Sequence, residues 1–170
     1  MDQELVMEPT HGPHGTAGAG KPWDVEIDVH LVKACPDPVF HLDTYLPIDP
    51  NTGFIVFENN HRPGFNIKFN LYDETGGGYT FPPQSKVDDA CWSQLGTSCP
   101  KTAKWDVFKP RNVSPDRLSL TVFNDNPSPP NGPLGVFKYA LRVTKDNGAS
   151  YCDLDPGGVD NNGARTVNVA

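Results

Sequence analysis

Acidic and amide side chains are dense near the end of the chain, where Asp153, Asp155, Asp160 and Asn162 follow one another closely. Carboxylate and amide oxygens are the ligands that Ca²⁺ prefers, and the ion takes about six to eight of them. The stretch therefore predicts a loop over 153–163 with a calcium site, and no other cofactor is indicated. The alternative interpretation is turn chemistry without a ligand, because Asp and Asn also bond their own backbone and Asp-Pro-Gly-Gly is a turn sequence.

The same carboxylates are the candidates for catalysis. Asp153, Asp155 or Asp160 would serve an aspartic-type peptidase if it lay within about 3 Å of another carboxylate, because the two would then share a proton. The chain carries no GxSxG, HExxH or Asp-Thr/Ser-Gly sequence that would mark another kind of hydrolase. The leading expectation is a non-enzymatic protein, with the peptidase as an alternative.

Two tryptophans supply a third possibility. Trp92 and Trp105 lie in polar segments and could form a platform on which a flat ligand stacks. Combined with calcium in the 153–163 loop, they would make a lectin-like, carbohydrate-binding module. The basic residues around Trp105 are diluted by Asp106 and Asp116, so this segment predicts a solvated strand face.

Charge and hydropathy exclude other classes of partner. The chain has 170 residues, with 14 Lys and Arg against 21 Asp and Glu, and a formal charge of −7. Binding to nucleic acid depends on clustered cations that release counterions, so such a partner is not expected. No apolar run approaches the roughly 20 residues of a membrane helix. Since the first residues also lack the pattern of a signal peptide, the sequence predicts a cytoplasmic protein.

The cysteines and histidines leave two questions open. Cys91 and Cys99 flank a polar loop and would be bridged in an oxidising compartment, whereas a reducing cytosol would keep them as two free thiols. No CxxC pair or run of Cys and His at zinc spacing is present. His30, His41 and His61 are isolated in the sequence and are expected to be ordinary surface or hydrogen-bonded residues.

The elements that must position these groups are strands. Apolar residues alternate with polar ones from Val25 to Leu31, which gives one buried and one wet face. A short helical turn is expected at most once, over 87–95. Turn residues separate the strands, so the pattern predicts an all-β, antiparallel β-sandwich with Greek-key connections and about seven to eight strands. The other expected strands lie at 54–57, 65–71, 105–108, 118–122, 137–143 and 150–154.

Composition divides the chain into three parts. Residues 1–22 form a flexible arm with Gly, Pro and His, residues 23–165 form the single sandwich domain, and residues 166–170 form a tail. Ordering a glycine-rich arm costs much conformational entropy, which a partner must offset. The leading hypothesis is therefore a module that self-assembles into a homo-oligomer, with the arm packed on a neighbouring subunit.

The last third of the chain also resembles a known family. Phe137 to Val143, then Asp146-Asn-Gly, Asp155-Pro156 and Asp160-Asn-Asn-Gly resemble the end of the DP-EP family of small, uncharacterised bacterial β-sandwich proteins. The resemblance implies a β-sandwich fold. An aspartic-type, self-cleaving peptidase activity has been suggested for a member of that family, and the resemblance would then make Asp155 the residue of interest.

Overall fold

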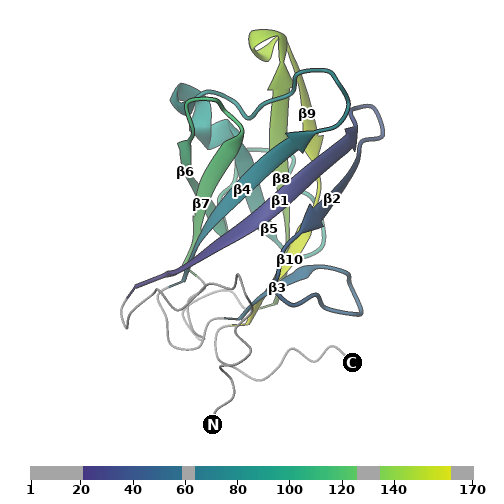
Figure 1. The fold of residues 1–170 in the computed structure, drawn as a ribbon. Helices are drawn as coiled ribbons and strands as arrows, with labels where there is room; N and C mark the ends of the chain where they lie inside the picture. Colours follow the sequence, from purple (N-terminus) through teal and green to yellow (C-terminus); the bar gives the residue numbers. More distant parts are fainter. Residues whose placement is uncertain (1–20, 59–63, 126–134, 162–170) are drawn as a thin grey trace.

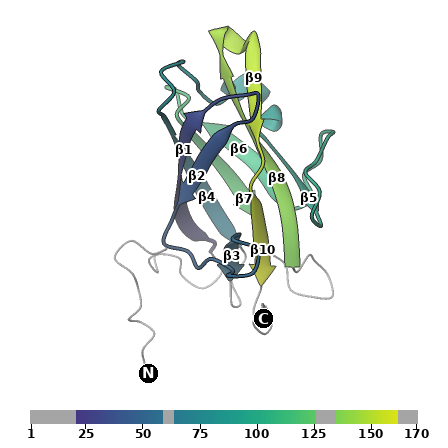
Figure 2. The same cartoon turned by 90° about the vertical axis from the view of Figure 1, so that its right-hand side faces the viewer.

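The computed structural model of the chain describes residues 21–58, 64–125 and 135–161. Two β-sheets pack face to face in this part of the chain, as Figure 1 shows from the front and Figure 2 from the side. The predicted all-β sandwich is confirmed.

One sheet, called sheet A, has the strand order β2-β1-β4-β7-β6. β1 and β4 run parallel, with Trp23 opposite Phe65 and Leu31 opposite Asp73, and the other pairs are antiparallel. The strands of sheet A are β1 (Trp23–Lys33), β2 (Val39–Asp43), β4 (Phe65–Asp73), β6 (Phe108–Val113) and β7 (Ser119–Asn124).

The opposing sheet B has the order β3-β10-β8-β5, with β9 also paired to β8. β9 and β10 follow one another along one edge of β8, and Asp155 and Pro156 separate them. The strands of sheet B are β3 (Ile55–Glu58), β5 (Cys91–Leu95), β8 (Gly135–Lys145), β9 (Ser150–Leu154) and β10 (Gly157–Asn161).

Both sheets are mixed, although the sequence predicted antiparallel ones. β3 and β10 run parallel, as β1 and β4 do. Alternating apolar residues fix which face of a strand is buried, but they carry no information on the direction of its neighbour. The described residues form ten strands, more than the seven or eight expected.

The core lies between the sheets and is rich in aromatic rings. Phe108 of β6 is at its centre, with ring centroids 5.6 Å from Phe57, 5.1 Å from Phe137 and 4.7 Å from Tyr139. Rings at such separations, several of them edge to face, stabilise the core beyond the area that they bury. The predicted alternation of buried and exposed residues is confirmed in β1, β4 and β8, where Val25, Ile67 and Leu141 are buried.

The helical turn expected over 87–95 is shifted. The 3₁₀ helix η2 spans Gln84–Asp89, and β5 takes up the rest of that range. Cys91 and Ser93 are buried while Trp92 and Gln94 are partly exposed, which is the period of a strand. A second short 3₁₀ helix, η3 (Asp146–Gly148), joins β8 to β9. No helix of the described residues is long and apolar enough to span a membrane.

A disulfide closes one edge of the sandwich. Cys35, between β1 and β2, is bonded to Cys152 of β9, and their Cα atoms are 5.6 Å apart. The proposed Cys91–Cys99 bridge is wrong, since both of these cysteines are free. Cys91 points into the core because β5 buries alternate residues, so it cannot meet a cysteine in the loop that follows. The alternative of two free thiols applies to Cys91 and Cys99, and the bonded pair lies 117 residues apart in sequence.

Candidate functional site

The stretch expected to be a calcium-binding loop is instead two strands. Asp153 lies on β9, Asp160 lies on β10, and Asp155 is in the short link between them. Their donor atoms do not gather into a metal site among the described residues. Asn162, the fourth expected ligand, lies outside those residues. The calcium site over 153–163 is therefore not formed by Asp153, Asp155 and Asp160.

Close packing explains why these glycines continue a strand. A Cβ atom at Gly157 would lie 2.5 Å from the ring of Phe54, and one at Gly158 would overlap the ring of Phe137. Glycine in a strand often marks the close approach of another group. The Gly-Gly pair thus lets two aromatic rings cover β10, where the sequence indicated a turn.

The three aspartates each have a partner of their own. Asp153 pairs with Arg142, and Asp155 forms an ion pair with Lys138 at 3.0 Å. Asp160 accepts a 2.7 Å hydrogen bond from Asn124. In the described part of the chain, no hydrogen bond joins any of the three to another carboxyl group, whether among themselves or elsewhere, so these residues do not show the shared-proton pair that an aspartic-type peptidase needs.

Asp160 is nevertheless unusual in its surroundings. It is 1% exposed, and its Oδ2 has no hydrogen-bond partner among the described residues. Burial raises the pKa of this carboxyl to about 7, with a smaller contribution from the charge of Asp125, while the hydrogen bond from Asn124 opposes the shift. Asp160 thus links the two sheets through Asn124, and its carboxyl group loses its contact with water.

A different set of side chains gathers on the outer face of sheet B. We call it the aromatic–arginine surface, and it consists of Trp92, Trp105, Arg142, Tyr151 and Asp153. Trp92 is on β5, Arg142 on β8, and Tyr151 and Asp153 on β9. Strand register brings them together, because Arg142 is opposite Asp153 and Trp92 is opposite Ala140, two residues before Arg142.

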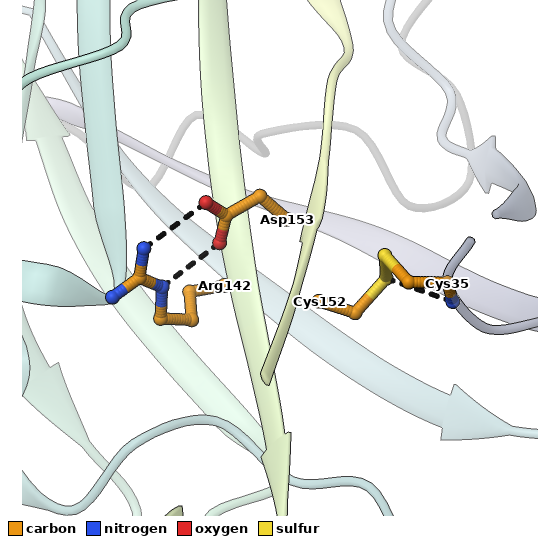
Figure 3. Close-up of a disulfide and its surroundings, with 4 residues drawn as sticks. All are labelled: Cys35, Arg142, Cys152 and Asp153. Atoms are coloured by element: carbon orange, nitrogen blue, oxygen red, sulfur yellow. Dashed lines mark hydrogen bonds and ion pairs between the residues drawn. A yellow bond between two sulfur atoms is a disulfide. The ribbon is translucent and has the colours of Figure 1, made fainter. Parts of the chain in front are cut away.

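Arg142 lies over two aromatic rings at once. Its guanidinium carbon is 3.9 Å from the ring centroid of Tyr151 and 5.3 Å from that of Trp92. Asp153 accepts hydrogen bonds from Nε at 2.8 Å and from Nη2 at 3.1 Å, which fixes the plane of the guanidinium. These bonds hold the pKa of Arg142 above its usual value. Figure 3 shows the pair on one side of β9 and the disulfide on the other.

The two tryptophans are held by a single backbone group. The indole nitrogens of Trp92 and Trp105 both donate to the carbonyl oxygen of Asp88, at 3.1 and 3.2 Å. Trp105 is 39% exposed and Tyr151 is 58% exposed, large fractions for aromatic side chains. The structure therefore brings together the two candidate stacking residues that the sequence indicated.

Arg142 and Tyr151 were missed by the sequence analysis. Each belongs to a strand whose alternation predicts an outward side chain, but contact between them depends on how β8 pairs with β9. The signal in the sequence was the short Asp146-Asn-Gly148 connection, which is typical of a hairpin. A hairpin there would have placed residues 141–144 beside residues 151–154.

Comparison with the models of known protein families and with curated proteins finds no match to this chain. The resemblance of the last third to the DP-EP family stays a prediction from its residues. The candidate site is therefore identified from the geometry of its residues.

Proposed function

We propose that this protein is a non-catalytic binding module whose aromatic–arginine surface takes a neutral carbohydrate. The observation that carries the proposal is the arginine held over two rings, half-buried Trp92 and exposed Tyr151, with Asp153 fixing its orientation. Trp105 extends the same surface, because its indole shares an acceptor with that of Trp92.

The chemistry of a sugar ring suits this surface. A pyranose has a face of C–H groups that packs on an aromatic ring, and hydroxyl groups around its edge that need hydrogen-bond partners. Ligand sites of this kind combine aromatic side chains with a few polar groups held in place. Arg142 supplies donors and Asp153 supplies acceptors, and their mutual hydrogen bonds orient both before a ligand arrives.

Charge argues for a neutral ligand. Two cations of this face are matched by carboxylates, since Arg142 pairs with Asp153 and Lys138 pairs with Asp155. Asp88, whose carbonyl oxygen accepts from both tryptophans, and Asp89, whose charge acts on Arg142, add negative charge. A polyanion would find no excess of positive charge here, in agreement with the acidic composition of the chain.

This proposal keeps one part of the lectin-like alternative and drops another. Trp92 and Trp105 remain the stacking residues, while calcium in the 153–163 loop is no longer involved. Self-association through residues 1–22 is a separate proposal, since residues 1–20 lie outside the described part of the chain.

The test is calorimetric titration of the full chain with oligosaccharides of neutral glucans, mannans, xylans and chitin. For the sugar that binds, Trp105→Ala and Tyr151→Ala each weaken binding about tenfold or more, corresponding to about 1.4 kcal/mol of lost contact. Tyr72→Ala is the matched control, because Tyr72 is an aromatic residue of sheet A that is 47% exposed. Absence of binding across the panel, or equal weakening by Tyr72→Ala, would contradict the proposal.

A further inference from the structure

The outer face of sheet A carries a second group of side chains with metal-ligand chemistry. Asp28 and His30 of β1 and Asp43 of β2 each offer one donor atom, and these atoms all lie within 4.8 Å of one another. Strand register produces the group, because Asp28 is directly opposite Asp43 and His30 follows on the same face of β1. Asp28 and His30 are partly buried, whereas Asp43 is exposed.

The two carboxylates face each other, and none of the lysines and arginines that the structure describes forms an ion pair with either of them. Like charges placed directly opposite on neighbouring strands destabilise a sheet. Asn70 donates to Oδ1 of Asp28 at 3.1 Å, which orients that carboxylate and leaves its other oxygen for a ligand. A cation between Asp28 and Asp43 would offset their repulsion.

Glu74, which is outside this group of three, orients His30 for binding a metal ion. Nδ1 of His30 lies 2.9 Å from Oε2 of Glu74, the residue that follows the end of β4. When Nδ1 carries the proton and donates it to Glu74, Nε2 keeps a lone pair. Histidines that bind metal ions usually donate their other N–H to a carboxylate in this way.

Ring stacking holds His30 in place as well. Its ring is stacked with those of His41 and Tyr72, with centroids 4.7 and 5.0 Å away. His41 lies on β2 and Tyr72 on β4, opposite His30 in both pairings, so the imidazole is supported from both neighbouring strands. A ligand whose orientation is fixed before the ion arrives loses little entropy on binding.

We propose that Asp28, His30 and Asp43 bind one divalent transition metal ion of the zinc class, with Glu74 as a positioning residue. One imidazole and two carboxylates suit Zn²⁺, whereas Ca²⁺ and Mg²⁺ prefer sites made of oxygen ligands alone. Three protein ligands leave at least one coordination position for water. The site is on sheet A and is independent of the carbohydrate proposal, which concerns sheet B.

The experiment is calorimetric titration of the full, metal-free chain with ZnCl₂. Every sample carries His11→Ala and His14→Ala, because these arm histidines could bind zinc themselves. One ion binds per chain, and His30→Ala and Asp43→Asn each weaken binding at least about tenfold. Asp24→Asn is the matched control, since Asp24 is an acidic residue of the same face of β1, hydrogen-bonded to Asn66 and outside the group. This control binds zinc as the parent does.

A second set of measurements tests the role of Glu74. Loss of a carboxylate that accepts a hydrogen bond from a metal-binding histidine typically weakens metal binding about 10–100-fold, so Glu74→Gln binds zinc more weakly than the parent. The visible spectrum of bound Co²⁺ keeps the parent's coordination pattern, because Glu74 is not a ligand. Any of three results would overturn the proposal. These are zinc binding that His30→Ala leaves unchanged, zinc binding that Asp24→Asn weakens as much as Asp43→Asn does, and zinc binding that is weaker than calcium binding. If His30→Ala does not fold, ¹⁵N spectra of the histidine rings of the parent protein test the site instead. Zinc binding must shift the Nε2 signal of His30, and an unshifted signal would refute the site.

Discussion

Asp160 of β10 reaches across the sandwich and accepts a 2.7 Å hydrogen bond from Asn124 of β7, which makes it a buried polar link between the two sheets. Both residues are buried. An ionised carboxyl in such a place is poorly solvated, and the stability of the fold must therefore depend on the charge of Asp160.

The first prediction concerns this pH dependence. The folded chain raises the pKa of Asp160 from 3.8 to about 7 through burial, so it binds the proton more tightly than the unfolded chain. Stability contributed by the protonated carboxyl is complete below about pH 4 and is lost as the pH rises through about 7. Each pKa unit corresponds to about 1.4 kcal/mol, so the loss is on the order of 4 kcal/mol.

Urea unfolding at a series of pH values measures this effect. Asp160→Asn keeps an acceptor for Asn124 and cannot ionise, so its free energy of unfolding falls less between pH 4 and pH 8 than that of the parent. A parent and variant with the same pH dependence would show that Asp160 is not the titrating group.

The second prediction concerns the disulfide. Replacing Cys35 and Cys152 together by serine lowers the free energy of unfolding by about 2–5 kcal/mol, because the bond closes a long loop in the unfolded chain. Denaturant unfolding measures the loss, and Cys99→Ser, which removes a free thiol, is the control. Peptide mapping without reductant recovers a Cys35–Cys152 peptide. Recovery of a Cys91–Cys99 peptide instead would refute the pairing.

The bond also bears on the compartment. Stable disulfides form in oxidising surroundings, while a reducing cytosol keeps thiols free. The cytoplasmic location expected from the sequence stays a prediction, and recovery of the Cys35–Cys152 bond from the native protein would favour an oxidising compartment instead.

The third prediction concerns the two free thiols. Burial raises the pKa of Cys91 far above its usual value, and burial together with Asp155 raises the pKa of Cys99 to about 11. Because the thiolate is the reactive form, both react slowly at neutral pH. A disulfide reagent labels Cys99 slowly in the folded protein and labels Cys91 after unfolding. Rapid labelling of Cys91 in the native protein would show that β5 opens.

The fourth prediction tests self-assembly. Deleting residues 2–21 lowers the number of subunits per particle, obtained by light scattering as the particle mass divided by the mass of one chain, if the arm connects subunits. It leaves the β-sheet signal in circular dichroism unchanged, since β1 begins at Trp23. The same number of subunits as in the full chain would remove the arm as the connector.

Local patterns in the sequence indicated the strands well and the sites poorly. Alternation placed Val25, Ile67 and Leu141 in the core because burial in a strand has a period of two residues. The contact of Arg142 with Tyr151 and the group of Asp28 with Asp43 depend on pairing between strands, and the bond of Cys35 to Cys152 depends on how the two sheets pack. No local pattern specifies that pairing. The segment that contains Asp153, Asp155 and Asp160 was predicted to be a loop. Close packing of its glycines against aromatic rings allows a strand there, and composition does not reveal such packing.

The central claim, that a carbohydrate binds on the outer face of sheet B, is tested most directly by the indole N–H signals in an ¹H–¹⁵N spectrum. The chain has three tryptophans, and Trp23 on sheet A is the internal control for Trp92 and Trp105. Adding the oligosaccharide that binds should shift the signals of Trp92 and Trp105 and leave that of Trp23 in place. A shift of Trp23 alone, or no shift of any indole signal, would contradict the account.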